Sequence, residues 1–385
     1  MIIRMLARTG RIPRMPFNVA CKSSRAAIPP MDHTKPKNRR NHMKTFRLDL
    51  WKPDEYTYEA AYGFMPNVHA YLHEEDAEVR RCMIVVPGGG YCMLAPHEGE
   101  LVAMEYYRMG LNVFVLTYTN DITMCVPLKK QPMSDLSRAV RLLRKHAAEY
   151  HLDPSKFLIC GFSAGGHVCG SLCTHFDDLT DPDPELNVIS NRPDGAIFGY
   201  PVITSGEFTH IYSMQALLGK NPTAQELEYF SVEKQVKENT PPCFLWQTAT
   251  DDLVPVENTY LFAKALKEKG VPFAHYVYPT GGHGLSVASM EQFTGWHGGE
   301  YVCEQLGFAL EHVKNDTAVG MNPQRKEELM QQFFAPKEPP KKAPEDENPP
   351  APNEFMKNLQ AGINPFADVN TWVELSRIWF ERLPG

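Results

Sequence analysis

One stretch, KFLICGFSAGGHVCG at residues 156–170, limits the fold more than any other. Its apolar run at 157–160 ends at Gly161, and Ser163 then stands between small residues in the pattern G-x-S-x-G. A serine on a sharp strand-to-helix turn is held in strained backbone geometry, and glycines flank it because bulky neighbours would clash there. The stretch therefore predicts a strand, a tight turn that presents the Ser163 hydroxyl at the edge of a sheet, and a helix of small residues.

From about residue 80 onward, strand patterns alternate with helical patterns. The expected strands are apolar runs rich in β-forming residues, at 82–86, 113–118, 157–160, 196–200, 243–247 and 273–278. Helical patterns lie between them, for example at 133–151 and 256–270. Such alternation is typical of a parallel sheet with helices on both faces. The sequence therefore predicts an α/β protein with a mostly parallel central sheet.

The N-terminal residues differ in composition from the rest of the chain. Residues 1–42 are rich in arginine and lysine, and Asp32 is their only acidic residue. We expect a basic tail without structure, although a transit peptide has the same composition. The main folded domain is expected at 43–290. Within it, the long connection at 203–240 follows a strand, where an insertion is well placed to shape a pocket mouth.

Two segments follow the last expected strand. Residues 335–352 are dense in proline and charge and cannot bury a core, so we expect an extended linker inside an insertion at 291–362. Residues 363–385 then carry apolar side chains near helical spacing, Trp372 and Trp379 among them. We expect this segment to be the terminal helix, packed on the domain, because its apolar stripe would be unfavourable in water. A peripheral appendage or a partner-binding segment is the alternative.

Charge and cysteine usage restrict the class of partner and the compartment. The net charge of −7 gives no reason to expect binding to nucleic acid or to an anionic membrane. The nine cysteines are odd in number and irregularly spaced, which favours reduced thiols in a cytoplasmic protein over a secreted disulfide framework. A transit peptide at 1–42 would change that location. The sequence leaves the oligomeric state open, including a homo-oligomer.

One cluster of metal-ligating residue types occurs just after the serine. His167, Cys169, Cys173 and His175 fall within nine residues, but their spacing fits no common zinc pattern. Small and soft residues also let a helix pack closely on a sheet. We therefore predict no metal site and no cofactor.

A serine hydroxyl is a poor nucleophile, so Ser163 needs a base and the base needs an acid. His283 lies in a glycine-rich loop after the last expected strand, whereas His167 lies one turn into the packed helix. Either Asp251 or Asp252, just after the strand at 243–247, can supply the carboxylate. Paired aspartates in a loop are also common as a solvated turn or a helix cap.

An acyl-transfer site also needs donors for an oxyanion. Gly88, Gly89 and Gly90 directly follow the strand at 82–86, and glycines let backbone N–H groups approach a substrate oxygen closely. A phosphate-binding loop is disfavoured, since no lysine follows at the required spacing and the pattern G-x-G-x-x-G is absent.

Taken together, these motifs resemble those of the α/β-hydrolase superfamily, in particular small carboxylesterases related to hormone-sensitive lipase and acetylxylan esterase. PGGGY followed by HEGE, then GFSAGGH, TPPCFLWQTATDDLVPVEN and YPTGGHGLS, occur in that family's order over about residues 44–290. One residue departs from the family's pattern. Pro87 stands at the position where many relatives have a histidine that supports the loop.

The resemblance implies roles for individual residues. Ser163 matches the nucleophile and His283 the base, and the family's D-x-x-V-P pattern falls on Asp251 rather than on Asp252. The oxyanion donors implied are the backbone N–H groups of Ala164 and of the Gly89 and Gly90 turn.

The function implied is that of a serine carboxylesterase. It would hydrolyse a short acyl ester, such as an acetyl ester, of a sugar or another small alcohol through an acyl-enzyme. Two alternatives stay open: a serine peptidase of the same fold, and a catalytically silent binding protein, although such proteins usually lack a triad member.

Overall fold

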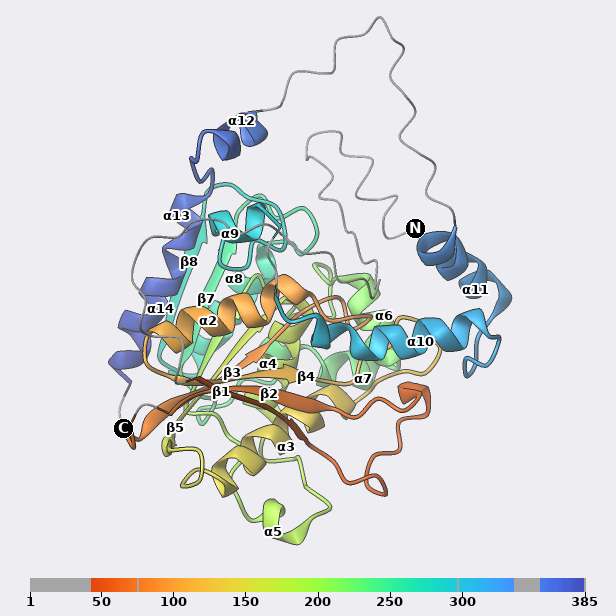
Figure 1. Cartoon of the computed structure of the whole chain (residues 1–385), viewed down its shortest axis with the longest axis horizontal. Helices are drawn as coiled ribbons and strands as arrows, with labels where there is room; N and C mark the ends of the chain where they lie inside the picture. Colours follow the sequence, from red (N-terminus) through yellow and green to blue (C-terminus); the bar gives the residue numbers. More distant parts are fainter. Residues whose placement is uncertain (1–42, 75, 296–297, 336–353, 384–385) are drawn as a thin grey trace, which may run out of the picture. The chain divides into compact units, whose positions relative to one another are not determined.

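The computed structural model describes residues 43–74, 76–295, 298–335 and 354–383. The predicted basic tail at 1–42 lies outside these residues, as does nearly all of the predicted linker at 335–352. Figure 1 shows the chain from β1 to α14.

A single eight-stranded sheet forms the centre of the described domain. Its spatial order is β1-β2-β4-β3-β5-β6-β7-β8. Strands β1 and β2 run antiparallel to their neighbours, and all other pairs are parallel. The strands are β1 (Met43–Asp49), β2 (Asn67–His73), β3 (Arg80–Val86), β4 (Asn112–Thr117), β5 (Leu152–Phe162), β6 (Gly195–Gly199), β7 (Cys243–Thr248) and β8 (Phe273–Tyr278). The predicted α/β class, with a mostly parallel sheet, is confirmed.

Helices cover both faces of this sheet, which is why the inner strands β4 and β6 are buried along their whole length. The helices are α2 (Glu100–Arg108), α3 (Gln131–Lys145), α4 (Ser163–His175), α5 (Pro184–Asn187), α6 (Ile211–Leu218), α7 (Ala224–Tyr229), α8 (Glu257–Glu268), α9 (Met290–Phe293), α10 (Glu304–Lys314), α11 (Pro323–Leu329), α12 (Glu354–Gln360), α13 (Ala367–Asn370) and α14 (Trp372–Glu381). In Figure 1, α2 and α14 lie next to each other at one face of the sheet, and α3 lies at the other.

Helix α14 packs directly on the sheet, far in sequence from the strands that it covers. Trp372 and Phe380 are fully buried, and the ring of Trp379 lies 5.8 Å from that of Phe244 in β7. The approach is so close that a Cβ at Gly195 of β6 would lie 2.7 Å from Leu383 Cδ1. The segment after the predicted linker therefore contributes to the core of the domain.

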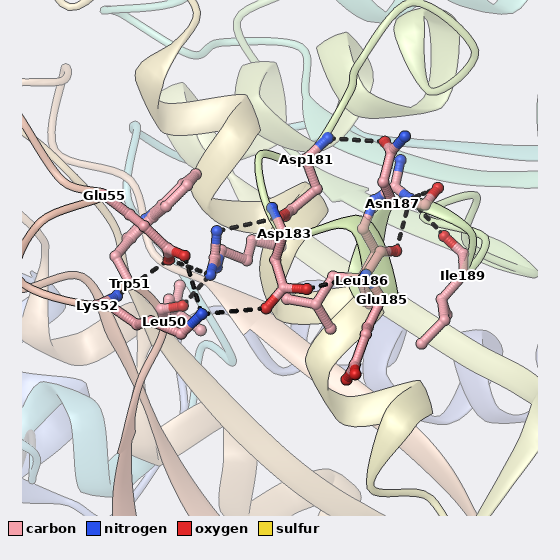
Figure 2. A network of polar contacts seen from close by, with 12 residues as sticks. Leu50, Trp51, Lys52, Glu55, Asp181, Asp183, Glu185, Leu186, Asn187 and Ile189 are labelled. Carbon is pink, nitrogen blue, oxygen red and sulfur yellow. Dashed lines mark hydrogen bonds and ion pairs between the residues drawn. The ribbon is translucent and has the colours of Figure 1, made fainter.

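On the opposite face, buried arginines of α3 tie two loops to the domain. Arg138 donates to Leu50 O (2.6 Å) and to Asp181 (3.0 Å), and it pairs with Glu55. Arg141 donates to three carbonyl oxygens at the end of α5, those of Leu186 (2.9 Å), Asn187 (2.6 Å) and Ile189 (2.6 Å). Figure 2 shows this network. Because its charges are matched by carboxylates and carbonyls, it holds loops in place rather than offering an open site.

Candidate active site

The turn that carries Ser163 joins β5 to α4 and has the strained geometry that the sequence predicts. Ser163 has φ 51°, in the left-handed region that residues other than glycine rarely adopt. Close contacts explain the neighbouring glycines. A Cβ on Gly165 would lie 2.1 Å from Val86 O, and one on Gly161 would lie 2.4 Å from Gly165 O. Any larger residue would force β3, β5 and α4 apart.

Three predicted residues from separate strand ends meet at this turn. His283 Nε2 lies 2.8 Å from Ser163 Oγ, and His283 Nδ1 lies 2.8 Å from Asp251 Oδ2. The second Asp251 oxygen accepts the backbone N–H groups of Leu253 and Val254, each at 3.0 Å. This is the arrangement in which a carboxylate orients an imidazole toward a hydroxyl.

The two adjacent aspartates contact His283 in different ways. Asp251 reaches the imidazole ring, whereas Asp252 Oδ1 accepts only the backbone N–H of His283, at 3.3 Å. Burial raises the pKa of Asp251, but His283 and the backbone donors lower it by more, so the pKa lies below its usual value. Burial likewise lowers the pKa of His283, and the Asp251 carboxylate outweighs that effect, so the His283 pKa lies above 6.5.

The glycine loop that contains Gly89 and Gly90, two of the predicted oxyanion donors, contacts the Ser163 turn through Gly88. A Cβ on Gly88 would lie 2.8 Å from Ser163 Cβ, so the glycine loop touches the turn. Gly88 itself donates to Glu98 Oε2 at 2.7 Å and is not available to a substrate. Gly89 and Gly90 have φ 123° and 66°, and their N–H groups have no acceptor within the described residues. Ala164 lies in the first turn of α4, where N–H groups lack intrahelical acceptors.

The chain is similar in sequence to known enzymes. The family model BD-FAE matches residues 68–191. Endo-1,4-beta-xylanase B of Butyrivibrio fibrisolvens is 63% identical over 263 residues, and acetylxylan esterase of Xylanibacter ruminicola is 30% identical over 218 residues. These matches cover 68% and 54% of this chain but only 41% and 42% of the two relatives, so the chain spans about two fifths of their length.

A solved structure matches over almost its whole length. The acetyl ester-xyloside bifunctional hydrolase from Caldicellulosiruptor lactoaceticus is 34% identical, with a TM-score of 0.61, and the match covers 72% of this chain and 99% of that one. The chain belongs to the α/β-hydrolase superfamily, among its carboxylesterases. In this α/β-hydrolase, Ser163 lies at the turn between β5 and α4.

The α/β-hydrolase site also contains a buried carboxylate that sequence reasoning missed. Glu98 lies below the glycine loop, where Oε2 accepts from Gly88 N and Oε1 accepts from Tyr200 OH at 2.8 Å. Tyr200 in turn accepts the N–H of Ser286 at 2.9 Å, and its ring lies edge-on to His283, 4.8 Å away. Glu98 and Tyr200 thereby connect the glycine loop to the histidine loop. HEGE contains Glu98, but nothing in that motif indicates these partners.

The long connection at 203–240 contributes a second missed residue, His210. Its Nδ1 lies 2.7 Å from Ser213 Oγ, and its Cε1 would lie 3.9 Å from a Cβ at Gly90. Burial and the nearby His283 lower the pKa of His210 to about 4, so its imidazole is neutral at pH 7. A neutral ring beside the glycine loop can bind a polar substrate group.

The cluster of histidines and cysteines on α4 is engaged in the core. His167 contacts Tyr91 OH (2.7 Å) and Phe230 O (2.8 Å) through its two ring nitrogens. His175 likewise contacts Asp178 (3.0 Å) and Tyr229 O (2.9 Å). Burial raises the pKa of Cys173 to about 12, which keeps its thiol protonated. In the part of the chain that the structure describes, no group of three or more such side chains could hold a metal ion.

Among the helices of the described residues, none combines the length and apolar composition that a membrane crossing requires.

Proposed function

We propose that this protein is a serine carboxylesterase that removes short acyl groups, such as acetyl, from sugars or other small alcohols. The observation that carries the proposal is the 2.8 Å contact between Ser163 Oγ and His283 Nε2 at the strand-to-helix turn. The acyl group and the alcohol are suggested by two relatives, one named an acetylxylan esterase and the other an acetyl ester-xyloside hydrolase.

The mechanism follows from the proposed roles. His283 Nε2 accepts the Ser163 proton while Oγ attacks the ester carbonyl, and Asp251 stabilises the imidazolium. The N–H groups of Ala164 and of Gly89 or Gly90 donate to the oxyanion. The tetrahedral intermediate collapses, His283 protonates the departing alcohol, and an acyl-serine remains. Water, deprotonated by His283, then attacks the acyl-serine and releases the acid.

Activity of the purified chain on several substrate classes tests the proposal. The panel holds p-nitrophenyl acetate, butyrate and octanoate, acetylated xylo-oligosaccharides, and aminoacyl-anilides. We expect hydrolysis of the acetyl esters to be fastest. Faster cleavage of the anilides would support a peptidase instead, and binding without turnover would support a silent scaffold.

Substitution of the serine tests its role. We expect Ser163→Ala to lower kcat by about 10⁴-fold or more, because the residues of a triad act as a unit. Ser171→Ala is the matched control, since Ser171 is a buried serine of the same helix whose hydroxyl points to His167 rather than to His283. Substantial turnover by a well-folded Ser163→Ala variant would refute the assignment.

A further inference from the structure

The loop that carries His283 is held by side chains from the end of the chain. Three consecutive carbonyls of the loop each accept a hydrogen bond from residues 364–372, which follow it by more than 70 positions. The bonds join Ser286 O to Trp372 Nε1 (2.8 Å), Val287 O to Asn370 Nδ2 (2.5 Å) and Ala288 O to Asn364 Nδ2 (2.7 Å). We call these three donors the loop clamp.

The loop has a conformation that needs such support. Ser286 and Ala288 have φ 48° and 49°, and both are fully buried together with Val287. Strained backbone of this kind persists only where the surroundings over-determine it. A buried carbonyl without a donor is costly, so each bond of the loop clamp also satisfies a group that water cannot reach.

Trp372 occupies a point where the three parts of the site converge. Its ring stacks at 5.1 Å on Trp246 of β7, which lies two residues before the end of the strand that leads to Asp251. The same ring meets Phe162, the residue before Ser163, edge-on at 5.8 Å. Its Nε1 then fixes the histidine loop. The Trp372 side chain therefore contacts the residue before Ser163, the strand that leads to Asp251 and the loop that carries His283.

We propose that Asn364, Asn370 and Trp372 are positioning residues that keep His283 within reach of Ser163. The proposal rests on the proposed esterase function. An error of about 1 Å in the position of a reacting group can cost about 100-fold in rate. Without the loop clamp, the histidine loop samples conformations in which the Oγ–Nε2 contact is broken. Turnover then falls, while substrate binding changes little because the three donors bond to carbonyls at 286–288 and not to the glycine loop.

Two variants remove a donor while keeping a side chain of similar shape. Trp372→Phe retains an aromatic ring against Trp246, and Asn370→Leu keeps the branched shape of asparagine. Trp379→Phe is the matched control, because it is the same change on the same helix. In the described structure Trp379 packs against Phe244 and Gly195 rather than on the histidine loop.

The experiment measures kcat and KM for p-nitrophenyl acetate well below each variant's Tm, together with amide hydrogen exchange over residues 284–289. We expect Trp372→Phe and Asn370→Leu to lower kcat by roughly tenfold with KM within twofold, and to speed exchange in the loop. We expect Trp379→Phe to leave both kcat and the exchange rate of the loop unchanged. A merely structural role would lower Tm and leave kcat intact.

The outcomes separate the two proposals. Unchanged exchange in both donor variants, or faster exchange with unchanged kcat, would overturn the loop clamp. An equal loss of kcat in Trp379→Phe would overturn it as well. A wild-type chain that hydrolyses no ester would instead refute the proposed function, and hydrogen exchange would still decide whether the loop depends on these donors.

Discussion

At the scale of single residues, His283 is subject to two opposing electrostatic effects. Burial disfavours its charged form and lowers its pKa, while the carboxylates of Asp251, Glu98 and Asp252 raise it. The net pKa lies above 6.5, and Asp251 contributes most of the increase because it is both close and hydrogen-bonded. A base must be unprotonated to accept the proton of Ser163. In the proposed mechanism, the pKa of His283 therefore sets the lower pH limit of activity.

This leads to a prediction about pH and the neighbouring aspartates. We expect kcat/KM of the wild type to fall as pH is lowered through a pKa above 6.5. Asp251→Asn removes the carboxylate that raises the pKa, so its acid limb shifts to lower pH, and its plateau falls by about 10⁴-fold because the imidazole loses its orientation. Asp252→Asn leaves the contact between Asp251 and the His283 ring intact, so its kcat/KM should fall far less.

The check is a pH–rate profile for the three proteins, with circular dichroism to confirm folding. If Asp252→Asn loses more activity than Asp251→Asn, the acid of the triad is Asp252, and the family spacing has been misapplied.

How far the site can be predicted depends on where its residues lie in the sequence. Ser163, Asp251 and the glycine loop each follow a recognisable strand, and His283 lies in the loop after β8, so local patterns identify all of them. Glu98 lies in the HEGE motif and Tyr200 at the end of an expected strand, but neither pattern indicates the contacts that the two residues make across the fold. Such contacts leave no periodic pattern in a single sequence.

At the scale of elements, the strand-to-helix turn that carries Ser163 is tightly packed. Helix α4 begins directly at Ser163 and runs against the end of β3, and both faces of its first turn consist of small residues. A protein interior of this density accommodates an added methyl group only by moving backbone.

A glycine substitution tests this packing. A Cβ on Gly165 would meet Val86 O at 2.1 Å and Pro87 O at 2.5 Å, so we expect Gly165→Ala to destabilise the protein by about 3 kcal/mol or more. Gly307→Ala is the control, because Gly307 lies in α10 with open space around its Cβ position. There alanine should be neutral or stabilise by about 0.5–1 kcal/mol. Urea denaturation gives both values, and equal effects would contradict the packing argument.

The elements themselves were predictable to different degrees. Strands β3 to β7 are covered on both faces and therefore read as continuous apolar runs. The sequence analysis did not predict strands β1 and β2. Edge strand β1, MKTFRLD, is largely exposed and has no apolar run, and β2, NVHAYLH, mixes histidines with apolar residues. Their pairing is set by the neighbouring strand rather than by their own composition.

At the scale of the whole molecule, helix α14 covers the part of the sheet face that α2 leaves uncovered. Tyr106 of α2 bonds Ser376 of α14 at 3.0 Å, and the ring of Phe380 lies 6.3 Å from that of Tyr106. This contact joins residues that lie 270 positions apart in the sequence. Residues on either side of the predicted linker thus form one hydrophobic core.

Ending the chain at Ala335 tests whether that core is complete without α14. Truncation would expose the sheet face that Val369, Trp372, Val373 and Phe380 now cover, and each side chain contributes about 1.5–3 kcal/mol through burial. Their combined loss approaches the total stability of a typical domain, about 5–15 kcal/mol. We therefore expect an insoluble or largely unfolded product. Phe380→Ala should remain folded but lose about 3–5 kcal/mol, whereas Arg377→Ala on the exposed face should change stability little. A chain ending at Ala335 with wild-type Tm and esterase activity would show that the terminal helix is an appendage.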